Sequence, residues 1–322
     1  MHPAARPHGY RNPTPLSETW SAPTTLEETM ATKLAGVYSA VATPFTADEK
    51  LDTARLRTLV DHTLSEGVHG LVPCGSTGEF STLSRAEREE VLEVVIEAAD
   101  SRVPVVPQTG ATSTAEAIAL SKHAERLGAQ AIMVVAPYYE PFSVEEIKSY
   151  YKDVAASVSI PVMAYNLPAA TGVNLTPAIL GELIDEVPNV QYVKDTSGDF
   201  TAAAQLIHEF GDKVSVFVGW DTLFCAALLE GAAGSVIGAA NVVPRQLVEV
   251  YDAVTAGDLI LARKQWHSIF PVMSNFVSGG YNAAIKAGME IIGRPAGPQR
   301  SPGAPLPTAQ HAALEAALAP FV

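Results

Sequence analysis

Apolar segments alternate with segments of helical periodicity along most of the chain, and no other feature restricts the fold as much. From residue 36 onward, each run rich in Val, Ile and Ala is followed by a stretch in which apolar residues recur at helical spacing. These runs are apolar throughout, which favours parallel strands that are covered on both faces. The predicted strands are 37–42, 70–73, 103–107, 131–136, 160–165, 190–194, 214–219 and 234–237.

The segments between the predicted strands carry the signals of helix ends. Ser84 with Glu87, and Ser143 with Glu146, have the spacing of a capping box. Eight strand–helix units in strict alternation predict an α/β fold, a closed (β/α)₈ TIM barrel, and an open doubly wound sheet is the competing architecture. No Gly-x-Gly-x-x-Gly follows the first predicted strand, which weighs against a dinucleotide-binding open sheet. The predicted helices are 52–66, 84–99, 113–127, 143–157, 177–186, 200–210, 222–230 and 244–256.

Three parts of the chain differ in pattern. Residues 1–33 are rich in Pro, Thr, Ser and Ala and lack apolar periodicity, so we expect a flexible N-terminal extension, in which Met30 is a second candidate for the start of translation. Residues 34–258 form the predicted (β/α)₈ barrel. Residues 259–322 form a predicted C-terminal helical appendage, with helices at 260–277, 281–292 and 307–318.

Composition argues against several classes of partner and environment. The formal net charge of −14, without a dense Lys/Arg cluster, argues against nucleic acid or an anionic membrane as a partner. No stretch is long and apolar enough to span a membrane, and the first residues lack the pattern of a secretory signal. The two cysteines, Cys74 and Cys225, do not make a disulfide framework. We therefore expect a cytoplasmic protein.

Lys194 ends the sixth predicted strand, after the apolar run that begins at Val190. In a (β/α)₈ barrel, functional side chains gather where the strands end and the following loops begin. A lysine at that place presents a primary amine to the mouth of the barrel, and an amine can attack a carbonyl carbon to form a Schiff base. For this residue taken alone, the alternative is a lysine that reaches out to solvent.

Polar residues at other predicted strand ends share that face of the barrel. Residues 75–79, Gly-Ser-Thr-Gly-Glu, can hold a carboxylate with backbone N–H groups and hydroxyls, or they can form an ordinary turn. Tyr165 can relay protons beside Lys194, or it can be a half-buried aromatic at a strand end. The eight histidines show no metal-binding spacing, so we predict no metal site and disfavour a metal-dependent aldolase.

Taken together, these residues make the chain resemble the family of dihydrodipicolinate synthase and N-acetylneuraminate lyase, the Schiff-base aldolases that handle pyruvate. The resemblance runs from residue 36 to residue 298, and four motifs in a fixed order carry it. The motifs are Gly75-Ser76-Thr77-Gly78-Glu79, Pro137-Tyr138-Tyr139, Tyr165-Asn166-Leu167-Pro168 and Lys194-Asp195-Thr196-Ser197-Gly198.

The resemblance implies a role for each of four catalytic candidates. Lys194 forms an imine with the 2-oxo group of pyruvate or a related acid, and the protonated imine stabilises the carbanion of C–C bond cleavage or formation. Tyr165 moves protons near the imine, and Ser76 and Tyr139 extend a hydroxyl relay toward solvent. In this family the tyrosine matched by Tyr139 typically crosses a tight dimer interface, and homotetramers are usual. No metal or organic cofactor is implied.

The resemblance also implies contacts with the substrate. Ser76 and Thr77, with their backbone amides, bind the carboxylate of the 2-oxo acid. The backbone carbonyl of Gly219 faces the substrate, and Asp221 matches an acidic position that binds polyols. The remaining predicted substrate-binding positions are Thr196 and Ala239.

Departures from the family pattern concern the second substrate. Ala170 stands where dihydrodipicolinate synthases usually carry an arginine that grips a carboxylate, and losing a bidentate clamp argues against that reaction. Thr222 replaces a glutamate of the sialic acid lyases and Ala239 replaces a serine, so the long tail of sialic acid would lose partners.

We therefore predict a class I lyase that forms an imine at Lys194 and catalyses aldol cleavage or condensation of a small 2-oxo acid. A short 2-keto-3-deoxy acid or a 4-hydroxy-2-oxo acid is the favoured substrate. Three alternatives stay open: dehydration of a sugar acid by the same imine chemistry, the true 4-hydroxy-tetrahydrodipicolinate synthase reaction, and a non-catalytic ligand-binding barrel.

Overall fold

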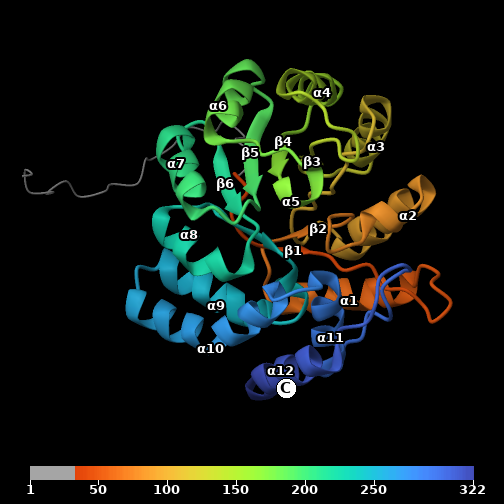
Figure 1. Ribbon diagram of the computed structural model, residues 1–322, viewed down its shortest axis with the longest axis vertical. Coiled ribbons are helices and arrows are strands. Elements are labelled where there is room, and N and C mark those ends of the chain that lie inside the picture. The colour runs from red at the N-terminus through yellow and green to blue at the C-terminus, as the bar shows by residue number, and fades with distance from the viewer. Residues whose placement is uncertain (1–32) are drawn as a thin grey trace, which may run out of the picture. The chain divides into compact units, whose positions relative to one another are not determined.

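The computed structural model describes residues 33–322 and contains a parallel sheet that curls into a barrel inside a ring of helices (Figure 1). The predicted extension at residues 1–33, with the alternative start at Met30, lies outside the described residues except for Lys33. The seven described strands follow the order β2-β1-β7-β6-β5-β4-β3, and all of their pairings are parallel. The strands are β1 (Gly36–Ala40), β2 (Gly70–Val72), β3 (Ile132–Val135), β4 (Val162–Asn166), β5 (Val190–Asp195), β6 (Ser215–Val218) and β7 (Gly234–Ile237).

The run at 103–107 joins the two edge strands of this sheet, but it is not the regular strand that the sequence predicts. It pairs with β2 through Val105, and Gln108, which follows it, pairs with β3, each as an isolated parallel bridge. Pro104 and Pro107 lack the N–H that a ladder requires, while their carbonyls accept backbone hydrogen bonds of 3.0 and 2.8 Å from β2 and β3. Together with the seven strands, the run at 103–107 therefore closes the barrel, which confirms the predicted fold class.

Helices cover the outer face of the barrel, and all but one of them begin within one residue of the predicted start. Ser84 and Ser143 each accept a hydrogen bond from the backbone three residues later, and Glu87 and Glu146 bond back, so both capping boxes form. The predicted helix at 222–230 begins later, because its first residues form a 3₁₀ turn. The helices of the ring are α1 (Thr53–Ser65), α2 (Arg85–Ala99), α3 (Thr114–Arg126), α4 (Val144–Ala156), α6 (Pro177–Glu186), α7 (Phe200–Phe210), α8 (Phe224–Glu230) and α9 (Pro244–Thr255).

Short helical turns occupy the loops at the carboxyl ends of several strands. They are η1 (Phe80–Thr82) after β2, α5 (Pro168–Thr171) after β4, η2 (Asp221–Leu223) after β6 and η3 (Gly238–Asn241) after β7. Such tight loops hold the residues at strand ends close to the mouth of the barrel.

Three further helices follow the barrel: α10 (Leu259–Val277), α11 (Tyr281–Ile291) and α12 (Thr308–Leu318), with the turn η4 (Ala319–Phe321) at the end. They are drawn in blue in Figure 1, where α10 lies beside α9. Because α11 packs against η3 and α10 against η2, this region reaches the mouth of the barrel. Within residues 33–322, no helix is long and apolar enough to cross a membrane.

Side chains of the strands alternate between the barrel interior and the surrounding helices. The interior is filled by large side chains that are at most 2% exposed, among them Tyr38, Met133, Met163, Tyr165 and Phe217. Tyr192 of β5 belongs to the same interior cluster. Lys194 follows it by two positions, so its side chain also points inward, at the carboxyl end of the barrel.

Candidate active site

A cavity of about 510 Å³ opens at the carboxyl ends of the strands. Its walls come from the ends of β4, β5, β6 and β7, from the loop after β2 and from the start of α11. This is where a (β/α)₈ barrel carries its chemistry. The predicted site residues that line the cavity are Ser76, Thr77, Tyr165, Lys194, Thr196, Gly219 and Asp221.

Lys194 lies in the wall of this cavity and is 4% exposed. It is paired in register with Tyr165 of β4 and Phe217 of β6. Its amine, Nζ, lies 4.0 Å from the centre of the Tyr165 ring. The predicted nucleophile and the predicted proton relay are therefore direct neighbours on adjacent strands.

Gly219 and Thr196 shape the space around the lysine. A Cβ on Gly219 would stand 2.6 Å from Lys194 Cε and would collide with Thr196 Oγ1, so this position accommodates only glycine. Among the described residues, the buried Thr196 Oγ1 has no hydrogen-bond partner. Buried polar groups are normally hydrogen-bonded, so this hydroxyl beside the cavity lacks a partner that a bound molecule would supply.

The ends of β4 and β5 are tied together directly beside the site. Asn166 Nδ2 donates to Asp195 Oδ1 at 2.8 Å, and Asn166 Oδ1 accepts from the backbone N–H of Leu175. Burial raises the pKa of Asp195, although hydrogen bonds from Ser197 and Asn166 oppose this effect. The link fixes the relative height of the two strands that carry Tyr165 and Lys194, and Asp195 itself does not line the cavity.

The predicted carboxylate loop, residues 75–79, forms a compact turn after β2. The N–H groups of Gly78 and Glu79 donate to the carbonyls of Gly75 and Ser76, each at 3.0 Å. Thr77 is 5% exposed and Ser76 is half-buried at the cavity wall. Hydroxyls and backbone groups of this loop thus meet the lysine across the cavity, an arrangement that suits the carboxylate of a 2-oxo acid.

Asp221 is deeply buried at the start of η2. It is 1% exposed, its Oδ2 accepts a 2.8 Å hydrogen bond from the Tyr281 hydroxyl, and its Oδ1 accepts one from the backbone N–H of Ala239. Burial raises its pKa to about 6, and the hydrogen bond from Tyr281 opposes that rise. Ala239 therefore meets Asp221 through its backbone, and it does not line the cavity.

Substitution of Asp221 by asparagine should flatten part of the pH dependence of stability. A carboxyl group with a raised native pKa stabilises the fold below its unfolded pKa, and this contribution is lost as pH rises through the native value. The pKa of Asp221 rises from 3.8 in the unfolded chain to about 6 in the native protein. Between pH 4 and pH 7, the free energy of unfolding of Asp221→Asn should therefore increase by about 2 kcal/mol relative to that of the wild type. Urea unfolding at several pH values measures this difference, and a difference that is constant with pH would contradict it.

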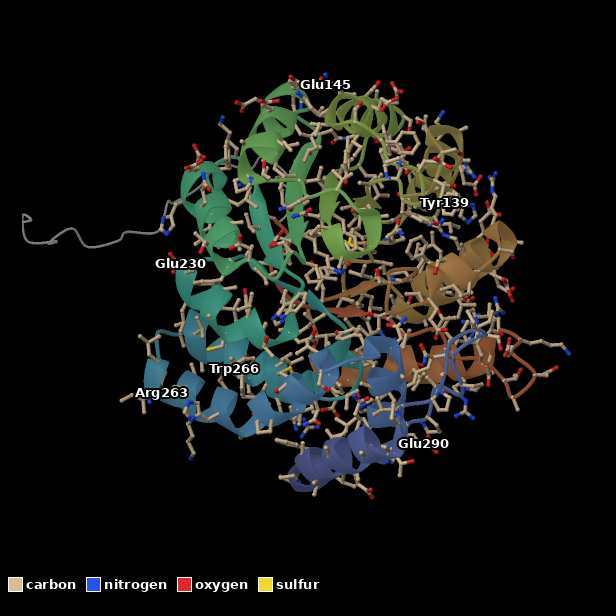
Figure 2. The ribbon with its side chains drawn as sticks, viewed as in Figure 1. Tyr139, Glu145, Glu230, Arg263, Trp266 and Glu290 are labelled. Atoms are coloured by element: carbon tan, nitrogen blue, oxygen red, sulfur yellow. The ribbon has the colours of Figure 1, made fainter. Side chains whose placement is uncertain are left out.

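Tyr139 is not brought to the cavity within this chain. Its side chain is 92% exposed, and its backbone has a φ of 83°, in the left-handed region that non-glycine residues seldom adopt. Figure 2 shows it on the side of the molecule where α2 and α3 lie.

Several residues that line the cavity were not predicted from the sequence. Trp220 follows Gly219, and Tyr281, Asn282 and Gln299 come from the region after the barrel. Asn282 Nδ2 donates to the carbonyl of Ser76 at 2.9 Å, and the Tyr281 hydroxyl accepts from the N–H of Gly238 at 2.9 Å. The sequence offered one signal for Tyr281 and Asn282, because these polar residues directly follow the Gly-Gly pair before α11. Helix periodicity alone, however, does not show which loop of the barrel they contact.

Residues 33–320 match the model of the dihydrodipicolinate synthetase family. The chain belongs to this family. Its members are lyases in which a lysine forms an imine with pyruvate, so the predicted enzyme class and the predicted carbonyl chemistry are confirmed. In this family the covalent lysine–pyruvate imine takes the place of a metal or an organic cofactor.

Relatives within the family are similar to most of the chain. It is 38% identical over 271 residues to the 4-hydroxy-tetrahydrodipicolinate synthase of Methanoculleus marisnigri, which covers 83% of the chain and 92% of that relative. It is 34% identical to a prophage protein of the dihydrodipicolinic acid synthase family from E. coli K12, solved in complex with pyruvate, with a TM-score of 0.85 over 89% of the chain and 98% of that structure. It is 32% identical to the chloride-inhibited dihydrodipicolinate synthase of Acinetobacter baumannii, which was also solved in complex with pyruvate. The TM-score is 0.86 over 89% of the chain and 98% of that structure.

Proposed function

We propose that this family member joins pyruvate reversibly to a short, neutral, hydroxylated aldehyde, through an imine at Lys194. One observation carries the choice of aldehyde. Among the described residues that line the cavity, Lys194 is the one cationic side chain, and it is needed for the imine. A second carboxylate would enter without a charged partner, which costs binding free energy.

The proposed reaction assigns a task to each group. The Lys194 amine attacks C2 of pyruvate and water leaves, which gives the imine. A C3 proton is lost through Tyr165, and the resulting enamine attacks the aldehyde carbon, whose oxygen takes up a proton. Water then hydrolyses the imine and frees the amine. Ser76 and Thr77 hold the carboxylate throughout, while the unpartnered hydroxyl of Thr196 supports the choice of a hydroxylated second substrate.

The true 4-hydroxy-tetrahydrodipicolinate synthase reaction is the second candidate, because the relatives at 36–38% identity carry that name. Its aldehyde bears a carboxylate, which Ala170 cannot clamp. Dehydration of a 2-keto-3-deoxy acid uses the same imine and is the third candidate. These three reactions differ in their products, so a single substrate screen separates them.

Borohydride trapping followed by an aldehyde screen tests the proposal. Reduction in the presence of pyruvate should leave a pyruvate-sized adduct on Lys194, located by peptide mass spectrometry. Neutral hydroxyaldehydes should then turn over faster than aspartate semialdehyde. An adduct with faster turnover of the acidic aldehyde would establish the synthase instead, and a folded protein without adduct would favour the binding-protein alternative.

The exposed and strained Tyr139 supports a proposal about assembly. We infer that it enters the active site of a partner subunit and that the protein is a cytoplasmic homotetramer built from tight dimers. The relay would then contain Ser76 and Tyr165 from one subunit and Tyr139 from its neighbour. Native mass spectrometry gives the subunit number, and a monomer with full activity would exclude this arrangement.

An arginine at position 170 should change the preference for the second substrate. Ala170 lies in α5 at the cavity wall, and Ala170→Arg would place a guanidinium where a carboxylate can be clamped. A hydrogen bond to a charged group contributes about 1.5–3 kcal/mol, so the ratio of kcat/KM for acidic over neutral aldehydes should rise roughly 10–100-fold. Ala170→Leu is the control for size, and it should leave the ratio near that of the wild type. An unchanged ratio in Ala170→Arg would show that this segment does not meet the aldehyde.

A further inference from the structure

The backbone of the carboxylate loop is strained and requires support from elsewhere. Cys74 and Glu79, which flank residues 75–78, have φ values of 58° and 55°, in the left-handed region that favours glycine. Gly78 lies so close to the residue that follows β1 that an added Cβ would stand 2.9 Å from the carbonyl oxygen of Val41. A loop in this state keeps its shape only when its surroundings hold it.

The side chain of Glu79 connects this loop to the region after the barrel. It is 5% exposed at the side chain, and its Oε1 forms a 2.6 Å ion pair with Nζ of Lys286, which is 6% exposed. Its Oε2 accepts a 3.0 Å hydrogen bond from the backbone N–H of Arg300. Both carboxylate oxygens are therefore engaged by residues that follow the barrel in sequence.

Lys286 belongs to α11 and is itself held from three sides. Its Nζ donates to the carbonyl of Pro298 at 2.7 Å and lies 4.5 Å from the centre of the Phe45 ring. Burial lowers its pKa, and the ion pair with Glu79 opposes that effect. One turn earlier on the same helix, Asn282 donates to the carbonyl of Ser76. Thus α11 contacts the loop near both of its ends, through the backbone carbonyl of Ser76 and through the carboxylate of Glu79.

We propose that the buried Lys286–Glu79 pair positions the loop at residues 75–79 for binding of the substrate carboxylate, so that α11 is a working part of the active site. Neither residue touches the reacting atoms, and both act through Ser76 and Thr77. The inference rests on the proposed function, because it takes the loop to be the carboxylate site. Loss of the pair lets the loop relax, which weakens pyruvate binding and leaves the chemistry at Lys194 intact.

Borohydride trapping over a range of pyruvate concentrations separates positioning from stability. In Lys286→Met, half-maximal trapping on Lys194 should need about 10–100-fold more pyruvate. The maximal extent of trapping should be unchanged, because the change weakens pyruvate binding and not the reaction of bound pyruvate. Lys148→Met is the matched control, since Lys148 has a side chain 7% exposed and pairs with Glu182 and Glu186 on the outside of the barrel. This control should lower the melting temperature without moving the half-maximal concentration.

A double variant covers the case in which Lys286→Met does not fold, because that change leaves Glu79 buried without a partner. Glu79→Gln with Lys286→Met removes both charges, and it should fold while still needing about 10–100-fold more pyruvate. If the folded variants trap pyruvate at the wild-type concentration, the positioning role is wrong although the lysine chemistry stands. If the wild type itself forms no adduct, both the proposed function and this inference fail.

Discussion

Replacement of Lys194 by alanine should abolish the borohydride-trapped adduct and reduce turnover by roughly 10⁴–10⁶-fold, the scale seen when a covalent nucleophile is removed. Among the described residues that line the cavity, Lys194 is the one amine, so no neighbour can take over the imine. The change also removes the nitrogen that lies 4.0 Å from the Tyr165 ring, while Tyr165 and the carboxylate loop keep their own contacts. Intact mass after reduction measures the adduct, and a coupled assay measures turnover.

Two further variants make this result interpretable. Lys194→Met retains most of the side-chain volume and should be as inactive as the alanine variant, which rules out a cavity effect. Lys213→Ala removes an exposed lysine that pairs with Asp185 on the surface, and it should trap pyruvate like the wild type. An adduct that persists in Lys194→Ala would show that another amine carries the chemistry.

Replacement of Tyr165 by phenylalanine should slow turnover by roughly 10²–10⁴-fold, the usual contribution of a positioned acid or base. Tyr165 is 2% exposed and its ring packs in the barrel interior, so phenylalanine preserves the packing beneath Lys194 and removes only the hydroxyl. The half-maximal pyruvate concentration should change little, because Ser76 and Thr77 still hold the carboxylate. Stopped-flow measurement of imine formation and of steady-state turnover checks the two steps separately.

Tyr192→Phe is the matched control for this experiment. Tyr192 is also buried in the barrel interior, two positions before Lys194, but its hydroxyl accepts a hydrogen bond from the backbone N–H of Leu34, away from the cavity. Its loss should cost about 0.5–1.5 kcal/mol of stability and leave turnover near the wild-type value. Equal rates for Tyr165→Phe and the wild type would remove Tyr165 from the proton relay.

The barrel could be predicted from the sequence because its signal is local and repeated. Each apolar run and each amphipathic stretch reports its own secondary structure, and eight repeats restrict the topology strongly. The segment at 103–107 shows the limit of such reasoning. Its apolar residues predict a strand, but Pro104 and Pro107 cannot donate to a ladder, so the segment closes the barrel through bridges alone.

The candidate site divides in the same way. Lys194, Tyr165, Ser76, Thr77, Thr196 and Gly219 stand at strand ends or in the loops that follow, and the rule that such ends meet at one rim of a barrel is sufficient to group them. Tyr139 also follows the end of a strand, β3, but within one chain its side chain is exposed and does not line the cavity. The proposed assembly assigns it to the site of a second subunit, and a single sequence holds no distance between subunits.

The sequence by itself determined the fold class and the family and singled out Lys194 as the candidate nucleophile, because these depend on periodicity and on motifs of adjacent residues. Only the tertiary structure decided that Asp221 is buried against Tyr281, and that Lys286 and Asn282 of α11 hold the carboxylate loop. These contacts join residues that are 60 to 207 positions apart. They depend on how α11 docks on the barrel, since burial and pairing arise from packing between distant segments, which no local pattern encodes.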